Sequence, residues 1–190
     1  LTTLTGSGMQ ATTYLARELP AGRILRSFGT RLYSALDNVL WYSDVYSPAL
    51  CSPTRSYVMF DAPITLLEHC DDGMYLCAGE TFWLAGDIES TTPKVVSPTT
   101  AVFGSGCPLP QQKVVVWMSD KGLVRAGAGG QLELVQDENV VVAPATSGAS
   151  VVLEADGQRH TISSLFGAHQ SGAAASSYMD AEVVRKGTTL

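Results

Sequence analysis

The chain has few charged residues and no long apolar run, and each shortage excludes a class of protein. Charged residues make up 16% of the 190 residues, whereas hydrophobic residues make up 45%. Disordered chains have the opposite balance. No apolar run reaches the roughly 18 residues that a membrane-spanning helix needs. Residues 1–16 lack the basic start and apolar block of a signal peptide. The sequence therefore predicts an ordered domain with a substantial core.

Cysteines and basic residues are also scarce. Cys51, Cys70, Cys77 and Cys107 have neither the density of a disulfide scaffold nor a paired metal-binding spacing. We expect reduced, structural thiols, with one disulfide as an open alternative. Lys and Arg number 12 against 18 Asp and Glu, so the net charge is −6. This balance excludes a basic footprint for nucleic acid over the whole chain, although a local basic patch stays open.

Helical periodicity is scarce too, and most of the chain has the pattern of short strands. Runs rich in Val, Leu, Tyr, Trp and Thr alternate with Gly, Pro, Asp and Asn. Asp72-Gly73 and Asp156-Gly157 each separate two such runs. An Asp-Gly pair in this position predicts a two-residue hairpin turn with positive φ. Residues 173–185 contain helix formers at helical spacing, but residues 179–183 also alternate as a strand does, so both interpretations stay open.

The turns recur in an order that predicts a structural repeat. Each unit consists of a strand, a tight turn, a strand of about six residues, a second turn and a third strand. Gly29, Gly73, Gly122 and Gly157 mark the equivalent turns and are 44, 49 and 35 residues apart. Antiparallel repeats of about 40–50 residues have the size of one propeller blade. The sequence contains about four such units.

We therefore predict an all-β fold built from antiparallel blades of a partial β-propeller over residues 1–165. Residues 166–190 form a C-terminal tail or docking segment, which is helical in one interpretation. Propellers usually have about four to eight blades. Four units make a small propeller, an arc that further chain completes, or a β-sandwich that resembles one. The start at Leu1 favours a segment of a longer polypeptide.

Tryptophans and long links give further expectations about packing. Trp41 and Trp83 fall at equivalent positions of the first two units, whereas Trp117 does not. Packing between blades explains these side chains without a ligand. Residues 44–63 and 87–110 form long links between units. Each link is either a protein-binding surface or an outer strand with its connection.

Residues of catalytic type are present, but their spacing assigns none of them a role. Propeller glycosidases use paired carboxylates near strand ends, and the sequence does not fix the separations that such pairs need. His69 and Cys70 are neighbours on an expected strand, so they point to opposite faces and do not form a nucleophile pair. With Cys77 they also lack zinc-ligand spacing. We predict no enzymatic activity and no catalytic, cofactor-binding or metal-ligating residue. The acidic candidates are Asp44, Asp61, Asp71, Asp72 and Asp87.

Two other groups of residues have competing interpretations. The run 119–122 (SDKG) is a shortened form of the Asp-box turn, which stabilises a turn and does not catalyse. Several arginines of the first unit form either a patch for a polyanion or an ordinary solvated face. These arginines are Arg17, Arg23, Arg26 and Arg31.

Two stretches of the chain carry a recognisable pattern: the runs 19–25 (LPAGRIL), 29–33 (GTRLY) and 38–44 (NVLWYSD), and the runs 64–67 (ITLL), 72–75 (DGMY) and 82–86 (FWLAG). Both resemble the blade pattern of β-propeller virion proteins of tailed bacteriophages, as found in tail hub, nozzle and DNA-stabilisation proteins. Residues 178–187 (YMDAEVVRKG) also resemble the end of phage proteins. The resemblance covers about residues 19–165.

The resemblance implies a structural component of a phage tail, a hub or nozzle protein without a cofactor. Its expected partners are other virion tail proteins and copies of itself, with passive contact to DNA in a channel and no membrane span. Its expected location is the virion, after assembly in the host cytoplasm. An acidic lumen suits DNA that slides without sticking. The alternative is a carbohydrate-binding or glycoside-processing propeller, whose mark is a pocket with convergent carboxylates and an exposed Trp41 or Trp83.

Overall fold

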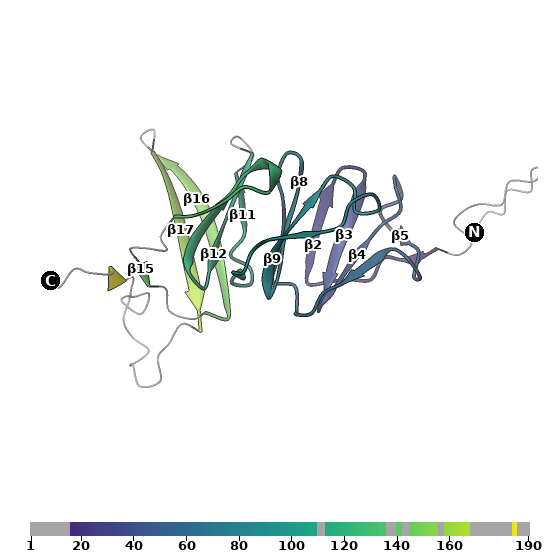
Figure 1. Cartoon of the computed structure of the whole chain (residues 1–190), viewed down its shortest axis with the longest axis horizontal. Coiled ribbons are helices and arrows are strands. Elements are labelled where there is room, and N and C mark those ends of the chain that lie inside the picture. Colours follow the sequence, from purple (N-terminus) through teal and green to yellow (C-terminus); the bar gives the residue numbers. More distant parts are fainter. Residues whose placement is uncertain are drawn as a thin grey trace, which may run out of the picture.

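The structure is a computed structural model that describes residues 16–109, 113–135, 140–141, 145–155, 158–167 and 184–185. The described part is all-β, as predicted, and its strands form small antiparallel sheets. Three four-stranded sheets and one hairpin stand side by side in sequence order along the long axis of the molecule (Figure 1). Within the described residues this row stays open and does not close into a ring (Figure 1).

The four main sheets are numbered here in chain order. Sheet 1 contains β2 (Ile24–Phe28), β3 (Arg31–Leu36), β4 (Val39–Tyr42) and β6 (Tyr57–Met59). Sheet 2 contains β7 (Leu66–His69), β8 (Gly73–Ala78), β9 (Glu80–Ala85) and β10 (Lys94–Ser97). Sheet 3 contains β11 (Cys107–Leu109), β12 (Val114–Ser119), β13 (Gly122–Ala126) and β14 (Leu132–Leu134). Sheet 4 is the hairpin of β16 (Ser147–Ala155) and β17 (Gln158–Phe166).

The repeat is more regular than the glycine spacing predicts. The second strands of the four sheets begin at Arg31, Gly73, Val114 and Gln158, which are 42, 41 and 44 residues apart. Gly122 breaks the predicted spacing because it opens the third strand of sheet 3, not the second. The first strands of neighbouring sheets, β2 with β7, β7 with β11 and β11 with β16, contact one another. The chain therefore repeats one antiparallel unit, each placed against the one before.

The predicted equivalence of the first two tryptophans is wrong by one residue. Trp83 pairs with Tyr75 across sheet 2, whereas Tyr33 pairs with Tyr42 across sheet 1. Tyr42 is therefore the counterpart of Trp83. A shift of one residue turns a side chain to the other face of a sheet, so Trp41 lies on the face of sheet 1 that points away from sheet 2.

The turn at Asp72-Gly73 differs from the prediction, although the hairpin itself is confirmed. The Cys70 N–H donates to the Gly73 carbonyl at 2.8 Å, so the chain reverses through Asp71 and Asp72. Gly73 already belongs to β8 and does not have a positive φ. A Cβ there would overlap the ring of Trp83, so glycine is needed for a close approach. The Asp156-Gly157 pair lies outside the described residues, but the strands on either side pair as predicted.

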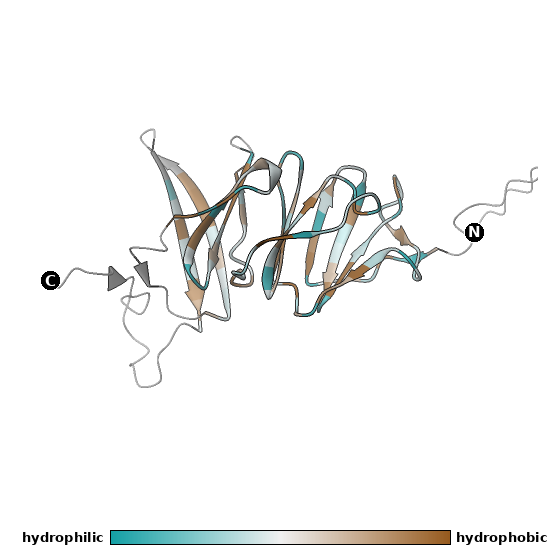
Figure 2. Cartoon of the chain, viewed as in Figure 1, coloured by the Kyte–Doolittle hydropathy of each residue, from teal (hydrophilic) through white to brown (hydrophobic). Residues whose placement is uncertain are grey.

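The core lies between the sheets, in two apolar clusters. Strand β8 is buried along its whole length because both of its faces are covered. Met74 and Leu76 pack toward sheet 1 with Tyr33 and Leu40. Tyr75 packs on the other face, in a cluster that also contains Trp83, Trp117, Val115 and Val124. Figure 2 shows hydrophobic segments on all four sheets. Each fully buried large side chain contributes roughly 1.5–3 kcal/mol through burial.

The long links and the C-terminal segment supply further strands. Residues 44–63 contain β5 (Leu50–Cys51) and β6, and residues 87–110 contain β10 and β11, so each link is an outer strand with its connection. Strand β5 pairs with β1 (Arg17–Glu18). Strand β18 (Val184–Arg185) pairs with β15 (Val140–Val141), which supports a docking strand at this point. The rest of the expected helix lies outside the described residues. No helix among the described residues is long and apolar enough to cross a membrane.

Candidate functional site

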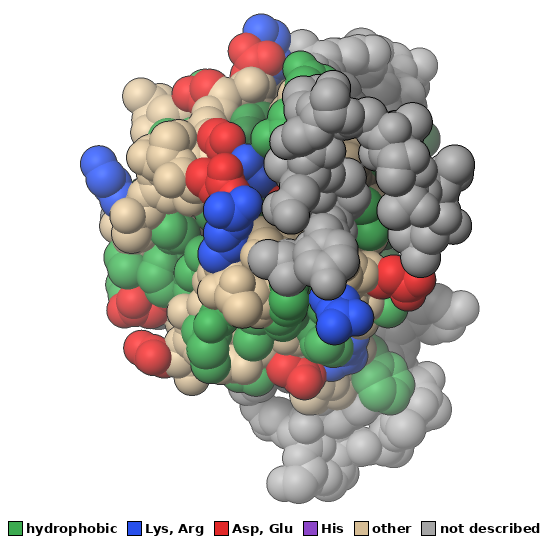
Figure 3. All heavy atoms as spheres, turned by 90° about the vertical axis from the view of Figure 1, so that its right-hand side faces the viewer, with side chains coloured by type: hydrophobic (Ala, Val, Ile, Leu, Met, Phe, Trp, Pro, Cys, Tyr) green, Lys and Arg blue, Asp and Glu red, His purple; other side chains and the backbone are tan. Residues whose placement is uncertain are grey.

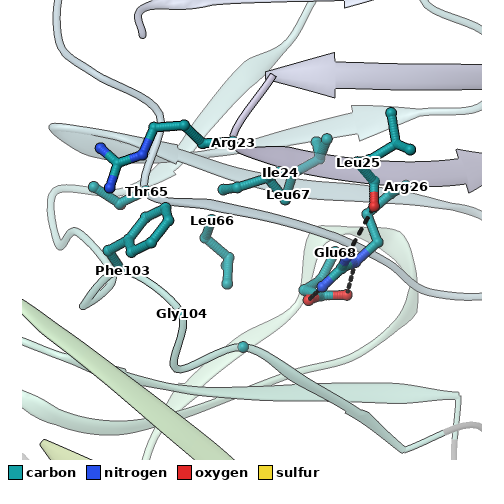
Figure 4. Close-up of a pocket in the computed structure, with 11 residues that line it drawn as sticks. Arg23, Ile24, Leu25, Arg26, Thr65, Leu66, Leu67, Glu68, Phe103 and Gly104 are labelled. Carbon is teal, nitrogen blue, oxygen red and sulfur yellow. Dashed lines mark hydrogen bonds and ion pairs between the residues drawn. The ribbon is translucent and has the colours of Figure 1, made fainter. Parts of the chain in front are cut away.

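A pocket opens where the first strands of sheets 1 and 2 lie side by side (Figure 4). Its volume is about 280 Å³. Strand β2 and the residue before it supply one wall, β7 supplies the second, and the loop before β11 supplies the third. The polar and aromatic residues that line it are Arg23, Arg26, Thr65, Glu68 and Phe103.

An ion pair between two sheets fixes the inner end of this pocket. Glu68 is 2% exposed, and its carboxylate accepts two hydrogen bonds from Arg26, from Nε at 2.9 Å and from Nη2 at 2.5 Å. Arg26 Nη1 also donates to the Leu25 carbonyl at 2.8 Å. The hydrogen bond to Glu68 raises the pKa of the Arg26 guanidinium. The carboxylate is thus held as a paired acceptor.

The rim of the pocket carries a second guanidinium. The guanidinium carbon of Arg23 lies 4.4 Å from the centre of the Phe103 ring, which is the geometry of a cation–π contact (Figure 4). Arg23 is exposed, so its donors face the pocket mouth and solvent. Two guanidiniums and one carboxylate leave one positive charge in excess. The site can therefore donate hydrogen bonds to an acceptor group, while Arg26 and Glu68 neutralise each other.

The predicted cluster of arginines does not form one patch. Arg26 is paired with Glu68, as described. Arg31 is buried in a different ion pair, with Nη2 at 2.7 Å from Glu89 and Nε at 3.2 Å from Asp87. Both arginines thus join sheet 1 to acidic groups that belong to sheet 2 or follow it. Their charges stabilise the packing of the sheets and are not directed at a polyanion.

The five acidic candidates do not converge on one site, and Asp71 and Asp72, although neighbours in one turn, have different partners. Asp71 pairs with Lys113 at 2.6 Å on the surface, and Asp72 accepts a hydrogen bond from the Gly129 N–H at 2.9 Å. Asp87 belongs to the Arg31 pair, Asp44 forms a bridge in the link after β4, and Asp61 is exposed. The pocket itself is lined by one carboxylate, that of Glu68. A glycosidase pair needs two.

The cysteines are free thiols, and most of them are buried. Cys51, Cys70 and Cys77 are buried, whereas Cys107 is partly exposed. Burial raises the pKa of both Cys70 and Cys77 to about 12, and the charges of Asp72 and Asp71 add to the effect on Cys70. These thiols are protonated at neutral pH and are poor nucleophiles.

The prediction that His69 and Cys70 point apart is confirmed. The ring of His69 is exposed and lies 6.1 Å from that of Phe28, whereas the Cys70 Sγ is directed at the Gly127 carbonyl. Among the described residues no group of three or more His, Cys, Asp and Glu side chains is arranged to hold a metal ion. His69 and Cys70 therefore do not form a thiol–imidazole pair, as their positions on the strand predict.

The Ser119 turn and the tryptophans have structural roles. Ser119 Oγ accepts from the Lys121 N–H at 3.1 Å and donates to the Gly122 carbonyl at 2.9 Å, so this motif stabilises its turn. Trp83 and Trp117 are buried between sheets 2 and 3, where the Tyr75 ring contacts both. Trp41 is half-buried on the outer face of sheet 1.

Sequence analysis missed two residues of the pocket, Glu68 and Phe103. Glu68 stands in the apolar run 66–70 with the same alternation as Leu66, and a carboxylate at a buried strand position is a signal for an ion pair. Phe103 lies in a long link and carries no comparable signal. Comparison with known proteins does not point to these residues either. No protein-family model matches the chain, and no curated protein matches its sequence.

Proposed function

We propose that the chain is a structural component of a bacteriophage tail, a propeller-like hub or nozzle protein that contacts neighbouring virion proteins. The resemblance of its blade runs supports the phage assignment. The observation that carries the structural role is the exposed apolar face of sheet 4. Val151, Leu153, Ile162 and Phe166 are 51–72% exposed there, at the end of the row of sheets. Apolar surface of this kind is typical of protein–protein contact sites.

The chemistry of the pocket supports the same conclusion. The Glu68 carboxylate of the pocket is paired with Arg26, and the second cation, Arg23, contacts the Phe103 ring. These contacts join sheets 1 and 2 to the loop before sheet 3. A row of sheets joined by such contacts suits a subunit that keeps its shape while forces act on the assembly.

Immunogold electron microscopy of virions tests the proposal. Antibodies raised against the purified chain should label one defined position on the tails of the phage that encodes it. Labelling absent from every particle of that phage would contradict the proposal. Preimmune serum provides the matched control.

A passive relation to DNA is the second part of the proposal. With a net charge of −6, the chain gains little from releasing the counterions of DNA. Fluorescence anisotropy with labelled duplex DNA, at low and at physiological salt, measures this directly. We expect no binding at either salt concentration. A tight complex that weakens steeply with salt would mean that the chain holds DNA actively.

Carbohydrate binding is the second candidate, and one observation favours it. The Trp41 and Tyr57 rings lie 5.2 Å apart on the outer face of sheet 1, and Tyr57 is exposed. Exposed aromatic rings are able to stack on sugar faces. A glycan array decides between the candidates. Binding that is lost in Trp41→Ala supports the sugar site, and an array without hits leaves the structural role.

A further inference from the structure

The row of sheets ends in an uncharged, apolar face on sheet 4. Val151 is opposite Ile162, Leu153 is opposite His160, and the Phe166 position lies on the same face. Ile162 and Phe166 are 52% and 72% exposed. The alternate residues of the two strands, among them Val152 and Leu165, are partly buried on the side of sheet 3. Sheet 4 therefore buries one face against sheet 3 and leaves the other face open.

At the opposite end of the row, sheet 1 has an outer face that the chain covers in part, because Ser34 at its centre is fully buried and donates to the Pro20 carbonyl, while apolar side chains around it are exposed. Two cross-strand rows run over it, one from Leu25 to Trp41 and Tyr57, the other from Leu36 to Met59. Leu25 and Met59 are 51% and 64% exposed. Figure 3 looks onto this end of the molecule and shows hydrophobic side chains on it, with charged ones among and around them.

The outward strand positions of both end faces carry no charged residue, although Figure 3 shows charged side chains of other segments among the hydrophobic ones at the sheet 1 end. The chain has 30 residues of the types Asp, Glu, Lys and Arg, counted as 18 acidic and 12 basic. None of them occupies an outward position in the strands of sheet 1, nor one of the exposed positions just described on sheet 4. Single exposed apolar residues are ordinary on a protein surface, whereas several of them gathered on one face mark an interaction site.

The two end faces are the two halves of an interface that the chain already forms internally. Sheet 1 packs its other face onto sheet 2, and sheet 2 packs onto sheet 3 in the same order. The open face of sheet 4 is equivalent to the faces with which sheets 1 and 2 each pack onto the next sheet in the chain. The outer face of sheet 1 is equivalent to the faces with which sheets 2 and 3 each pack against the sheet before them. A face of each kind is therefore exposed on every copy.

We infer that these faces bind each other between two copies of the chain, head to tail. Two different faces in contact make a heterologous interface, which closes into a ring when the rotation per copy allows it. Two copies with four sheets each give a ring of eight sheets, within the range of about four to eight known for propeller blades. This inference rests on the proposed function, because it assumes an assembly that contains several copies of the chain. It adds which surfaces of those copies are in contact.

Light scattering coupled to size-exclusion chromatography tests the inference on the 190-residue chain. The expected mass is twice 20.1 kDa at micromolar concentration. Phe166→Asp places a charge on the sheet 4 face, and Met59→Asp places one on the sheet 1 face. Each variant alone should elute at the monomer mass. Val95→Asp is the matched control, because Val95 is 53% exposed on β10, away from both faces, and it should keep the dimer mass.

A mixture of the two variants makes the test specific for head-to-tail contact. Phe166→Asp keeps an intact sheet 1 face and Met59→Asp keeps an intact sheet 4 face, so the mixture should recover the mass of one heterodimer. Leu25→Asp replaces Met59→Asp if circular dichroism shows that the latter does not fold.

Three outcomes would overturn the inference. A wild-type mass of 20.1 kDa means that the chain itself or another protein covers the faces. A dimer that Phe166→Asp breaks and Met59→Asp leaves intact means that sheet 4 faces pair with each other. A ladder of higher masses means an open filament in place of a ring. Failure here leaves the tail assignment to the labelling experiment, so the two proposals fail separately.

Discussion

Removal of the Arg26 guanidinium tests the ion pair that joins sheets 1 and 2. In Arg26→Met the side chain keeps most of its length, but the Glu68 carboxylate loses both of its donors while it stays 2% exposed. Breaking a buried pair by removing one partner costs roughly 3–5 kcal/mol. The Arg26 side chain is 38% exposed and the pocket of about 280 Å³ admits water. We therefore expect a smaller loss of roughly 2–3 kcal/mol in the free energy of unfolding, because water replaces part of the lost hydrogen bonding.

A double variant separates the charge from the packing. In Arg26→Met/Glu68→Leu neither charge remains, and an apolar pair of similar volume replaces them. Such replacements are often neutral or stabilising, so the double variant should lie within about 1 kcal/mol of the wild type. Lys113→Met is the control. It breaks the Lys113–Asp71 pair, whose side chains are 63% and 52% exposed, and it should leave the midpoint unchanged.

Guanidinium denaturation followed by tryptophan fluorescence measures all of these variants. Changes in midpoint at constant slope report stability. The reasoning is refuted if Arg26→Met costs no more than Lys113→Met. It is also refuted if the double variant is as unstable as Arg26→Met, because the loss would then come from packing and not from an unpaired carboxylate.

Three further predictions concern sheet 2. Tyr75→Phe should cost about 1–2 kcal/mol in the same denaturation assay, because the Tyr75 hydroxyl lies 2.5 and 2.8 Å from the Gly127 and Gln131 carbonyls and shares its one proton between them. Gly73→Ala should cost about 1–3 kcal/mol through overlap with the Trp83 ring, and an unchanged midpoint would contradict the close approach. Burial raises the pKa of Cys77 from 9.0 to about 12, so as the pH rises the unfolded chain loses this proton before the folded chain does. The contribution of this thiol to stability is therefore complete below pH 9 and is lost between pH 9 and 12. Denaturation midpoints measured against pH should show this fall in the wild type and a flatter one in Cys77→Ala.

The strand pattern was predictable from the sequence because hairpins depend on local residues. Alternation and turn residues indicate strands without reference to distant parts of the chain. The role of Gly73 was not predictable in this way. An Asp-Gly pair is typical of a turn with positive φ, but here the glycine leaves room for Trp83, ten residues later along the chain and adjacent in space. A glycine that is needed for a close approach of another side chain has the same local sequence pattern as a glycine that is needed for a positive φ.

The candidate site was less predictable, since its contacts join distant residues. Arg26 and Glu68 are 42 residues apart in sequence and meet only because sheets 1 and 2 stack. Arg23 and Phe103 are also distant in sequence, and they meet because the loop before β11 reaches the start of sheet 1. The order of the sheets places these pairs together, and neither residue type nor spacing specifies that order. Trp41 lies on the outer face because the register of sheet 1 differs by one residue from the predicted one. That register depends on the length of a turn, which composition does not determine.

Native mass spectrometry of the protein isolated from its phage or host tests the central claim most directly. The claim is that this row of antiparallel sheets is a structural subunit of a tail assembly. It predicts complexes that hold several copies of the chain, together with other virion proteins, and these should persist at physiological salt. A single species at 20.1 kDa, free of other proteins, would contradict it.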